Sequence, residues 1–167
     1  MDFDSQNKIL KYNNPIDCIE DFVYKYEADV LRDSPNDLTL SFKGLWRSYN
    51  VFVKWDEFNK IINLSSCFEV TAKNNISSKV HNLISKVNER VNLGYFSFNE
   101  ELEKIFFNYK ISIRGIDFLT IEQIEDFLDV VIKECEKFFP VFYVFLKRKQ
   151  NPDFALDAAL IDTRGEA

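Results

Sequence analysis

The chain has 167 residues, of which 46% are hydrophobic, and a formal net charge of −6. A chain of this length is expected to form one domain that buries about 70% of its unfolded surface. The acidic balance disfavours nucleic acids and anionic membrane surfaces as partners, because both are bound through basic patches.

Three cysteines, Cys18, Cys67 and Cys135, are odd in number and widely spaced. This pattern argues against a disulfide framework or a zinc site and for a reducing compartment. The N-terminus has no basic region followed by an apolar region, so no signal peptide is expected. The longest apolar run, 138–146, is too short to span a bilayer. We therefore expect a cytoplasmic protein.

The first residues with a structural signal are Asn14 and Pro15. We expect residues 1–13 to be a flexible lead-in and residues 14–167 to form a single domain. Asparagine before proline is typical of a helix start. Apolar residues then recur at steps of three and four as far as Val30, which predicts one helix up to a break at 34–37.

Alternation of apolar and polar residues predicts five strands, near 38–43, 49–55, 62–70, 95–98 and 105–114. Short connections between the first three favour an antiparallel meander. The last strand has the clearest alternation, and one set of its side chains should face the helices. That set comprises Ile105, Phe107, Tyr109, Ile111 and Ile113, and Phe106, Lys110 and Arg114 should lie on the other side.

Two longer helices and one short helix complete the predicted fold. A helical stripe over 76–91 ends at Gly94, and a second begins with a capping box at Thr120. Pro140 should kink or interrupt that second helix. A short helix should run from Asn151 to Leu160. The predicted fold class is therefore α+β, in the order α-β-β-β-α-β-β-α-α, with a five-stranded, mainly antiparallel sheet and helices on one face.

The sequence contains no catalytic signature. His81 is the only histidine, and its place on a helical segment beside apolar residues favours a structural or surface role. Cys67 should be the most accessible thiol, although no cationic neighbour in sequence would stabilise a thiolate. The four glycines are too far apart for a phosphate loop. We therefore predict no catalytic residue, no cofactor and no enzymatic activity.

Four carboxylates fall on one side of the third long helix, where they could hold a hard cation. Most of them lie in the first turns, where the helix dipole favours acids, so a solvated acidic face is the better interpretation. We predict no metal site there. The residues are Glu122, Glu125, Asp126 and Asp129.

The sheet face turned away from the helices is the candidate functional surface. Alternation places large apolar side chains on it beside polar ones, a mixture typical of protein interfaces. The alternative is a shifted register, or coverage of this face by the short last helix. The candidate interface residues are Phe52, Lys54, Ile61, Phe106 and Lys110.

Several segments together resemble the YbjN-type family, labelled as bacterial sensory transduction regulators, in its alphaproteobacterial form. The resemblance covers about residues 14–167, and its most specific part is the tail at 158–167. The other matching segments are Asn14-Pro15-Ile16-Asp17, Trp46-Arg47-Ser48-Tyr49, Phe52-Val53-Lys54-Trp55, Asn88 to Phe96 and Glu134 to Pro140.

This resemblance implies a fold similar to type III secretion chaperones and a small, acidic, often dimeric protein whose sheet surface holds another polypeptide. It implies no catalytic residues. We therefore predict a non-enzymatic protein-binding adaptor or regulator that forms a homodimer and binds a protein partner, with no nucleic-acid or membrane partner. The alternative is a small-molecule or metal-binding sensor with a pocket between sheet and helices, lined by Trp46, Trp55 and Tyr95.

Overall fold

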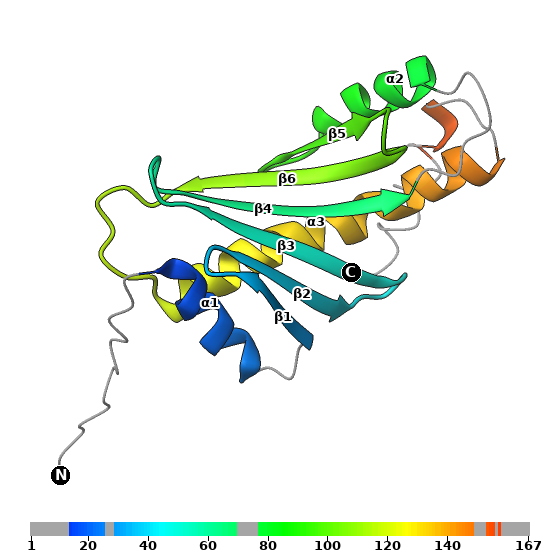
Figure 1. Cartoon of the computed structure of the whole chain (residues 1–167). Coiled ribbons are helices and arrows are strands. Elements are labelled where there is room, and N and C mark those ends of the chain that lie inside the picture. The colour runs from blue at the N-terminus through cyan, green and yellow to red at the C-terminus, as the bar shows by residue number, and fades with distance from the viewer. Residues whose placement is uncertain (1–13, 26–28, 70–76, 149–152, 156, 158–167) are drawn as a thin grey trace, which may run out of the picture.

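The computed structural model describes residues 14–25, 29–69, 77–148, 153–155 and 157. Their order in the chain is helix, four strands, helix, two strands and a long helix (Figure 1). The elements are α1 (Pro15–Tyr24), β1 (Asp29–Ser34), β2 (Asp37–Lys43), β3 (Ser48–Asp56), β4 (Ile61–Glu69), α2 (Ser77–Asn88), β5 (Tyr95–Asn99), β6 (Lys104–Ser112) and α3 (Ile121–Arg148).

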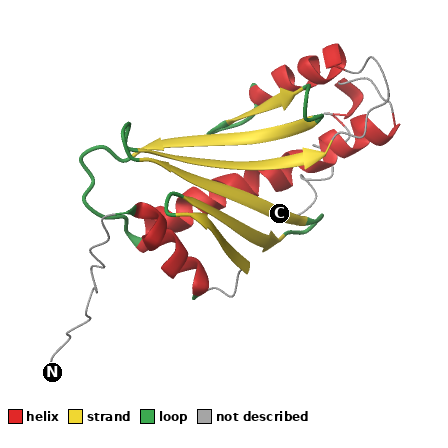
Figure 2. Ribbon diagram, viewed as in Figure 1, coloured by secondary structure: helices red, strands yellow, loops and turns green. Residues whose placement is uncertain are grey.

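The strands form one antiparallel sheet in the order β1-β2-β3-β4-β6-β5. The long helix α3 crosses one face of this sheet, α1 lies at its β1–β3 side, and α2 lies beside the edge strand β5 (Figure 2). Apolar residues of all three helices join a single core with one set of strand side chains. The α+β fold class predicted from the sequence is confirmed.

Burial along the strands alternates as the sequence predicts. In β3, Tyr49, Val51, Val53 and Trp55 are buried, whereas the residues between them are exposed. In β6, Ile105 and Phe107 are fully buried and Lys110 is exposed, so the predicted facing of this strand is confirmed. The sheet therefore has one face in the core and one face that no helix among the described residues covers.

The sheet has six strands rather than five, because the prediction that the first helix reaches Val30 is wrong. The helix ends at Tyr24, and residues 29–34 form the edge strand β1. Val30 pairs with Leu40 and Leu31 pairs with Thr39. A short edge strand has only one paired neighbour, so apolar and polar residues alternate only weakly along it. The spacing of Val30 from the preceding apolar residues matches the helical period by chance.

The predicted helix starts are confirmed by their capping bonds. The side-chain oxygen of Asn14 accepts from the backbone N–H of Ile16 at 2.9 Å. At the start of α3, the Thr120 hydroxyl accepts from Gln123 N–H at 3.2 Å, and the Gln123 side chain accepts from Thr120 N–H at 3.0 Å. This reciprocal pair is a capping box.

Pro140 does not interrupt α3, which continues to Arg148. The proline removes one backbone hydrogen bond. However, Val141, Phe142 and Phe145 beyond it are buried in the core, and this packing stabilises the last turns. Of the predicted short last helix, residues 153–155 and 157 are helical. The remainder, the lead-in at 1–13 and the tail at 158–167 lie outside the described residues.

Candidate functional site

The five candidate interface residues all lie on the sheet face opposite the helices. Phe52 is 39% exposed, Lys54 and Lys110 are exposed, and Ile61 and Phe106 are half-buried. Their core-facing neighbours along each strand are buried, so the predicted register is correct. We call this surface the open face. It consists of the outward residues of all six strands.

The two phenylalanines of the open face lie on either side of the central strand β4. Phe52 is opposite Ser65, and Phe106 is opposite Cys67. Strands are spaced about 4.8 Å apart, so two strand spacings and a two-residue offset separate the rings. Ser65 and Cys67, the residues of β4 between them, have small side chains.

Two more large apolar side chains share this surface. Directly paired residues of antiparallel strands lie on the same face. The pairs across the sheet place six residues in one row, of which Leu31 is 62% exposed and Tyr95 is 45% exposed. The row is Leu31, Thr39, Phe52, Ser65, Asn108 and Tyr95. The sequence analysis did not assign Leu31 and Tyr95 to this surface, because it placed Leu31 in a helical segment and Tyr95 in a pocket.

Polar and charged side chains surround the apolar ones. Lys54 and Lys110 are in one cross-strand row with Asn63 between them. The Lys54 ammonium is 3.8 Å from the Asp37 carboxylate, and the Asn108 amide donates to the Ser97 hydroxyl at 3.0 Å. An apolar centre within a wetter rim is the usual composition of a protein interface.

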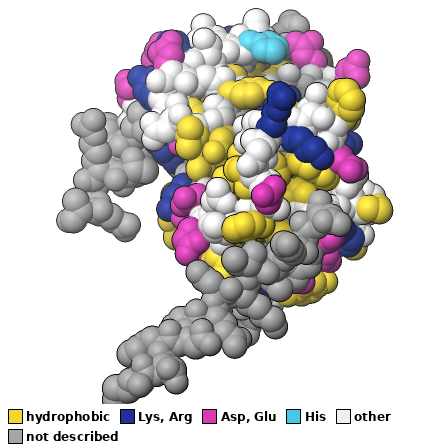
Figure 3. Space-filling view, turned by 90° about the vertical axis from the view of Figure 1, so that its left-hand side faces the viewer, with side chains coloured by type: hydrophobic (Ala, Val, Ile, Leu, Met, Phe, Trp, Pro, Cys, Tyr) yellow, Lys and Arg dark blue, Asp and Glu magenta, His cyan; other side chains and the backbone are white. Residues whose placement is uncertain are grey.

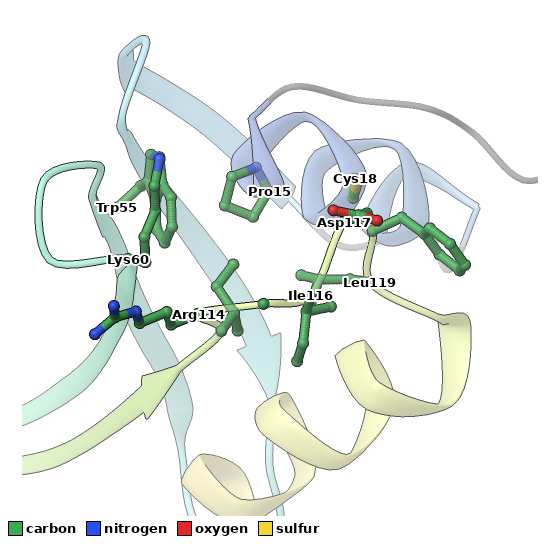
Figure 4. A pocket seen from close by; sticks show the side chains of 11 residues that line it. Pro15, Cys18, Trp55, Lys60, Arg114, Ile116, Asp117 and Leu119 are labelled. Carbon is green, nitrogen blue, oxygen red and sulfur yellow. The ribbon is translucent and has the colours of Figure 1, made fainter.

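The three aromatic residues proposed to line a shared pocket are not brought together. Trp46 precedes β3 and is 53% exposed, whereas Trp55 lies near the other end of that strand. Tyr95 belongs to the open face. Trp55 alone lines a pocket, which lies between the N-terminal turn of α1 and the loop from β6 to α3 (Figure 4).

The remaining candidates for chemistry lie on the surface or in the core. His81 is exposed on α2, with its Nε2 atom 3.1 Å from the Glu100 carboxylate. The four acids of α3 are exposed, and no three metal-ligating side chains gather anywhere in the described part of the chain. Burial raises the pKa of the Cys18 thiol, and burial raises that of Cys135 to about 12. No helix among the described residues is long and apolar enough to cross a membrane.

The segments that carry the family resemblance make structural contacts. The guanidinium of Arg47 lies over the rings of Phe68 and Phe139, 5.9 and 5.7 Å from their centroids. The backbone N–H of Leu45 donates to the Glu136 carboxylate at 2.7 Å. These contacts connect the β2–β3 turn to α3.

Comparison with known proteins gives one family and two similar structures. The YbjN family model, described as "Putative bacterial sensory transduction regulator", matches residues 15–143. The crystal structure of YbjN from E. coli is similar at a TM-score of 0.52 and 13% identity, over 80% of this chain and 90% of that one. The crystal structure of the ExsC–ExsE complex has a TM-score of 0.49 and 15% identity, over 74% and 92%. No curated protein matches the sequence.

Proposed function

We propose that this chain, which belongs to the YbjN family, is an adaptor or regulator that acts by binding another polypeptide on its open face. The observation that carries the proposal is the one-sided fold. All three helices contribute to the core on one face, and the other face presents Leu31, Phe52, Tyr95 and Phe106 among polar neighbours. The proposal includes a cytoplasmic location, since the described cysteines are all free thiols.

The open face is somewhat smaller than one side of a standard protein interface. Six strands at about 4.8 Å spacing span about 24 Å, and strands of five to nine residues are about 17–30 Å long. The product is about 400–700 Å², somewhat below the roughly 800 Å² that each partner buries in an interface of standard size. A partner that covers this face and some of the residues around it would therefore bury an area large enough for a specific contact.

The two phenylalanines of the open face are not sufficient by themselves for micromolar affinity. Burying one phenylalanine side chain stabilises a complex by about 1.5–3 kcal/mol. Phe52 is 39% exposed and Phe106 is half-buried, so together they would contribute less than about 3–6 kcal/mol. A micromolar complex requires about 8 kcal/mol. Leu31 and Tyr95 are therefore needed as well, and the contact should extend across the full row of paired strands.

The first occupant to test is a second copy of the chain, because two-fold dimers place the same surface on both partners. Light scattering should give twice the chain mass of 19.7 kDa for the wild type. Phe52→Lys combined with Phe106→Lys should return the mass to that of the monomer. The variant should still unfold cooperatively, since neither ring belongs to the core, and its melting temperature should fall only by the stability that dimerisation adds.

A matched control is Phe58→Lys, because Phe58 is 94% exposed in the β3–β4 turn and lies off the open face. This variant should remain dimeric. A wild-type monomer at every concentration would contradict self-association, and a dimer that survives the double substitution would show that another surface forms it.

A further inference from the structure

A pocket of about 440 Å³ opens at the end of the molecule where α1, the β3–β4 turn and the β6–α3 loop meet. Pockets of about 300–1,000 Å³ are typical of small-molecule sites. Trp55 faces the helices, whereas Phe52 three residues earlier faces the opposite way. The pocket is therefore separate from the open face. Its apolar walls are Pro15, Trp55, Ile113, Ile116, Phe118 and Leu119.

Two cations line the same pocket. The Lys60 ammonium lies 5.6 Å from the centroid of the Trp55 ring. The Lys60 carbonyl accepts from the Ile113 N–H at 2.9 Å, which brings the next residue, Arg114, beside the turn. In Figure 4, Lys60 and Arg114 are on the Trp55 side, and Asp117 is on the side of α1. Figure 3 shows this end of the molecule, with Lys and Arg side chains beside hydrophobic surface.

Neither cation has an anionic partner in the part of the chain that the structure describes. Lys60 and Arg114 form no ion pair there, although other cations of the protein do, such as Arg32 with Asp17 at 2.9 Å. Among the described residues, Asp117 is the one acid that lines the pocket. The lining thus combines an indole, an apolar wall and a positive charge excess, which suits an anion that carries an apolar body.

The backbone at Lys60 is held in an unfavourable conformation. Its φ is 56°, in the left-handed region that disfavours residues with a Cβ atom. The turn is fixed by the Asp56 carboxylate, which accepts from the backbone and the side chain of Asn59 at 3.0 and 2.8 Å. Asparagine or glycine would suit position 60 better. Strained backbone conformations of this kind cluster at ligand sites, where they hold a side chain in the position that binding requires.

We propose that this pocket binds a small aromatic monocarboxylate. The ring of the ligand packs on the apolar wall, against the small exposed edge of the Trp55 indole, and Lys60 and Arg114 hold its carboxylate. Arginine is suited to this role because its planar guanidinium donates two parallel hydrogen bonds to a carboxylate. The site goes beyond the proposed adaptor function and does not depend on it.

The test is an NMR titration of the full ¹⁵N-labelled chain with indole-3-acetate and with its neutral amide, indole-3-acetamide. Indole-3-acetate should shift the Gly115 and Ile116 amides and the Trp55 indole N–H in a saturable way. Indole-3-acetamide should bind at least about tenfold more weakly than indole-3-acetate, because hydrogen bonds to a charged carboxylate are stronger than those to a neutral group. Equal affinity for the two compounds, or shifts confined to other surfaces, would overturn the proposal.

Lys60→Asn separates a binding role from a structural one. This variant relieves the backbone strain and should melt at the same or a higher temperature, yet it should weaken indole-3-acetate binding at least about fivefold. Arg114→Gln should weaken it similarly. The control variant Lys43→Asn also removes one lysine charge, but at the end of β2 that lies away from the pocket. It should bind indole-3-acetate like the wild type. Unchanged affinity in both Lys60→Asn and Arg114→Gln would refute the site.

Discussion

The side-chain amide of Asn88 makes two hydrogen bonds with the backbone of Phe96. Its oxygen accepts from the Phe96 N–H at 2.8 Å, and its nitrogen donates to the Phe96 carbonyl at 3.0 Å. Within the part of the chain that the structure describes, β5 is an edge strand paired only with β6. Asn88, the last residue of α2, therefore provides hydrogen-bond partners for the outward backbone groups of Phe96 in β5. This protects the edge of the sheet at Phe96 from pairing with another strand.

Asn88→Ala should destabilise the fold by about 2–4 kcal/mol, because it leaves two partly buried backbone groups without partners. Asn88→Asp should cost about half as much, since a carboxylate still accepts from the Phe96 N–H but cannot donate to the carbonyl. Urea unfolding of the three proteins measures both values. Equal stability of Asn88→Ala and wild type would mean that water replaces the amide without cost.

Gly94 should be far less replaceable than Gly115, although both have positive φ, 80° and 84°. A Cβ atom at Gly94 would lie 2.6 Å from the Asn108 carbonyl oxygen and 2.6 Å from the Phe107 ring, whereas one at Gly115 would meet nothing within 4 Å. Gly115→Ala should cost about 1–2 kcal/mol for the backbone alone. Gly94→Ala should cost about 2–5 kcal/mol, because overpacking adds to that penalty. Equal losses in denaturant unfolding would contradict this difference.

Adjacent phenylalanines of β6 should differ in their contribution to stability. Phe107 is fully buried and packs on Phe96, with ring centroids 5.0 Å apart, whereas Phe106 is on the open face. Phe107→Ala should cost about 3–5 kcal/mol through the cavity that it leaves. Phe106→Ala should cost less than about 1.5 kcal/mol in the monomer, since it leaves no core cavity. Thermal unfolding at matched concentration distinguishes them, and the reverse order would invalidate the assignment of the two sheet faces.

One thiol of the native protein should react readily with an aromatic disulfide reagent at pH 8. Burial keeps the pKa of Cys18 and of Cys135 above its usual value, so both stay protonated at that pH. Cys67 lies half-buried on the open face. Cys67→Ser should remove the fast reaction, and unfolding should expose all three thiols of the wild type. Fast reaction of two or more native thiols would argue against this packing.

Much of the fold is predictable from the sequence because its strands have one apolar and one polar side. The alternation in β3, β4 and β6 predicts both their positions and their faces, and the caps at Asn14 and Thr120 predict two helix starts. β1 is not predictable in this way. As an edge strand it buries only part of one side, so Val30 and Leu31 carry no clear period of two.

The candidate interface follows from the same alternation, but its extent requires the pairing register. Leu31 and Tyr95 join Phe52 in one row only because six strands are aligned across the sheet, which local sequence does not specify. The pocket at Trp55 could not be predicted either. It depends on the contact between Lys60 and Ile113, residues far apart in the sequence, which brings together two loops without a recognisable motif.

The central claim, that the open face is the surface through which this protein binds other polypeptides, is tested most directly by photo-cross-linking in its natural host. A benzophenone analogue of phenylalanine is placed at position 52 or 106, and at Phe58 or Tyr143 as aromatic controls that are exposed elsewhere. We predict discrete cross-linked species from positions 52 and 106, with either a second copy or another protein, and none from the controls. Cross-links from the control positions alone, or none from any position, would contradict the claim.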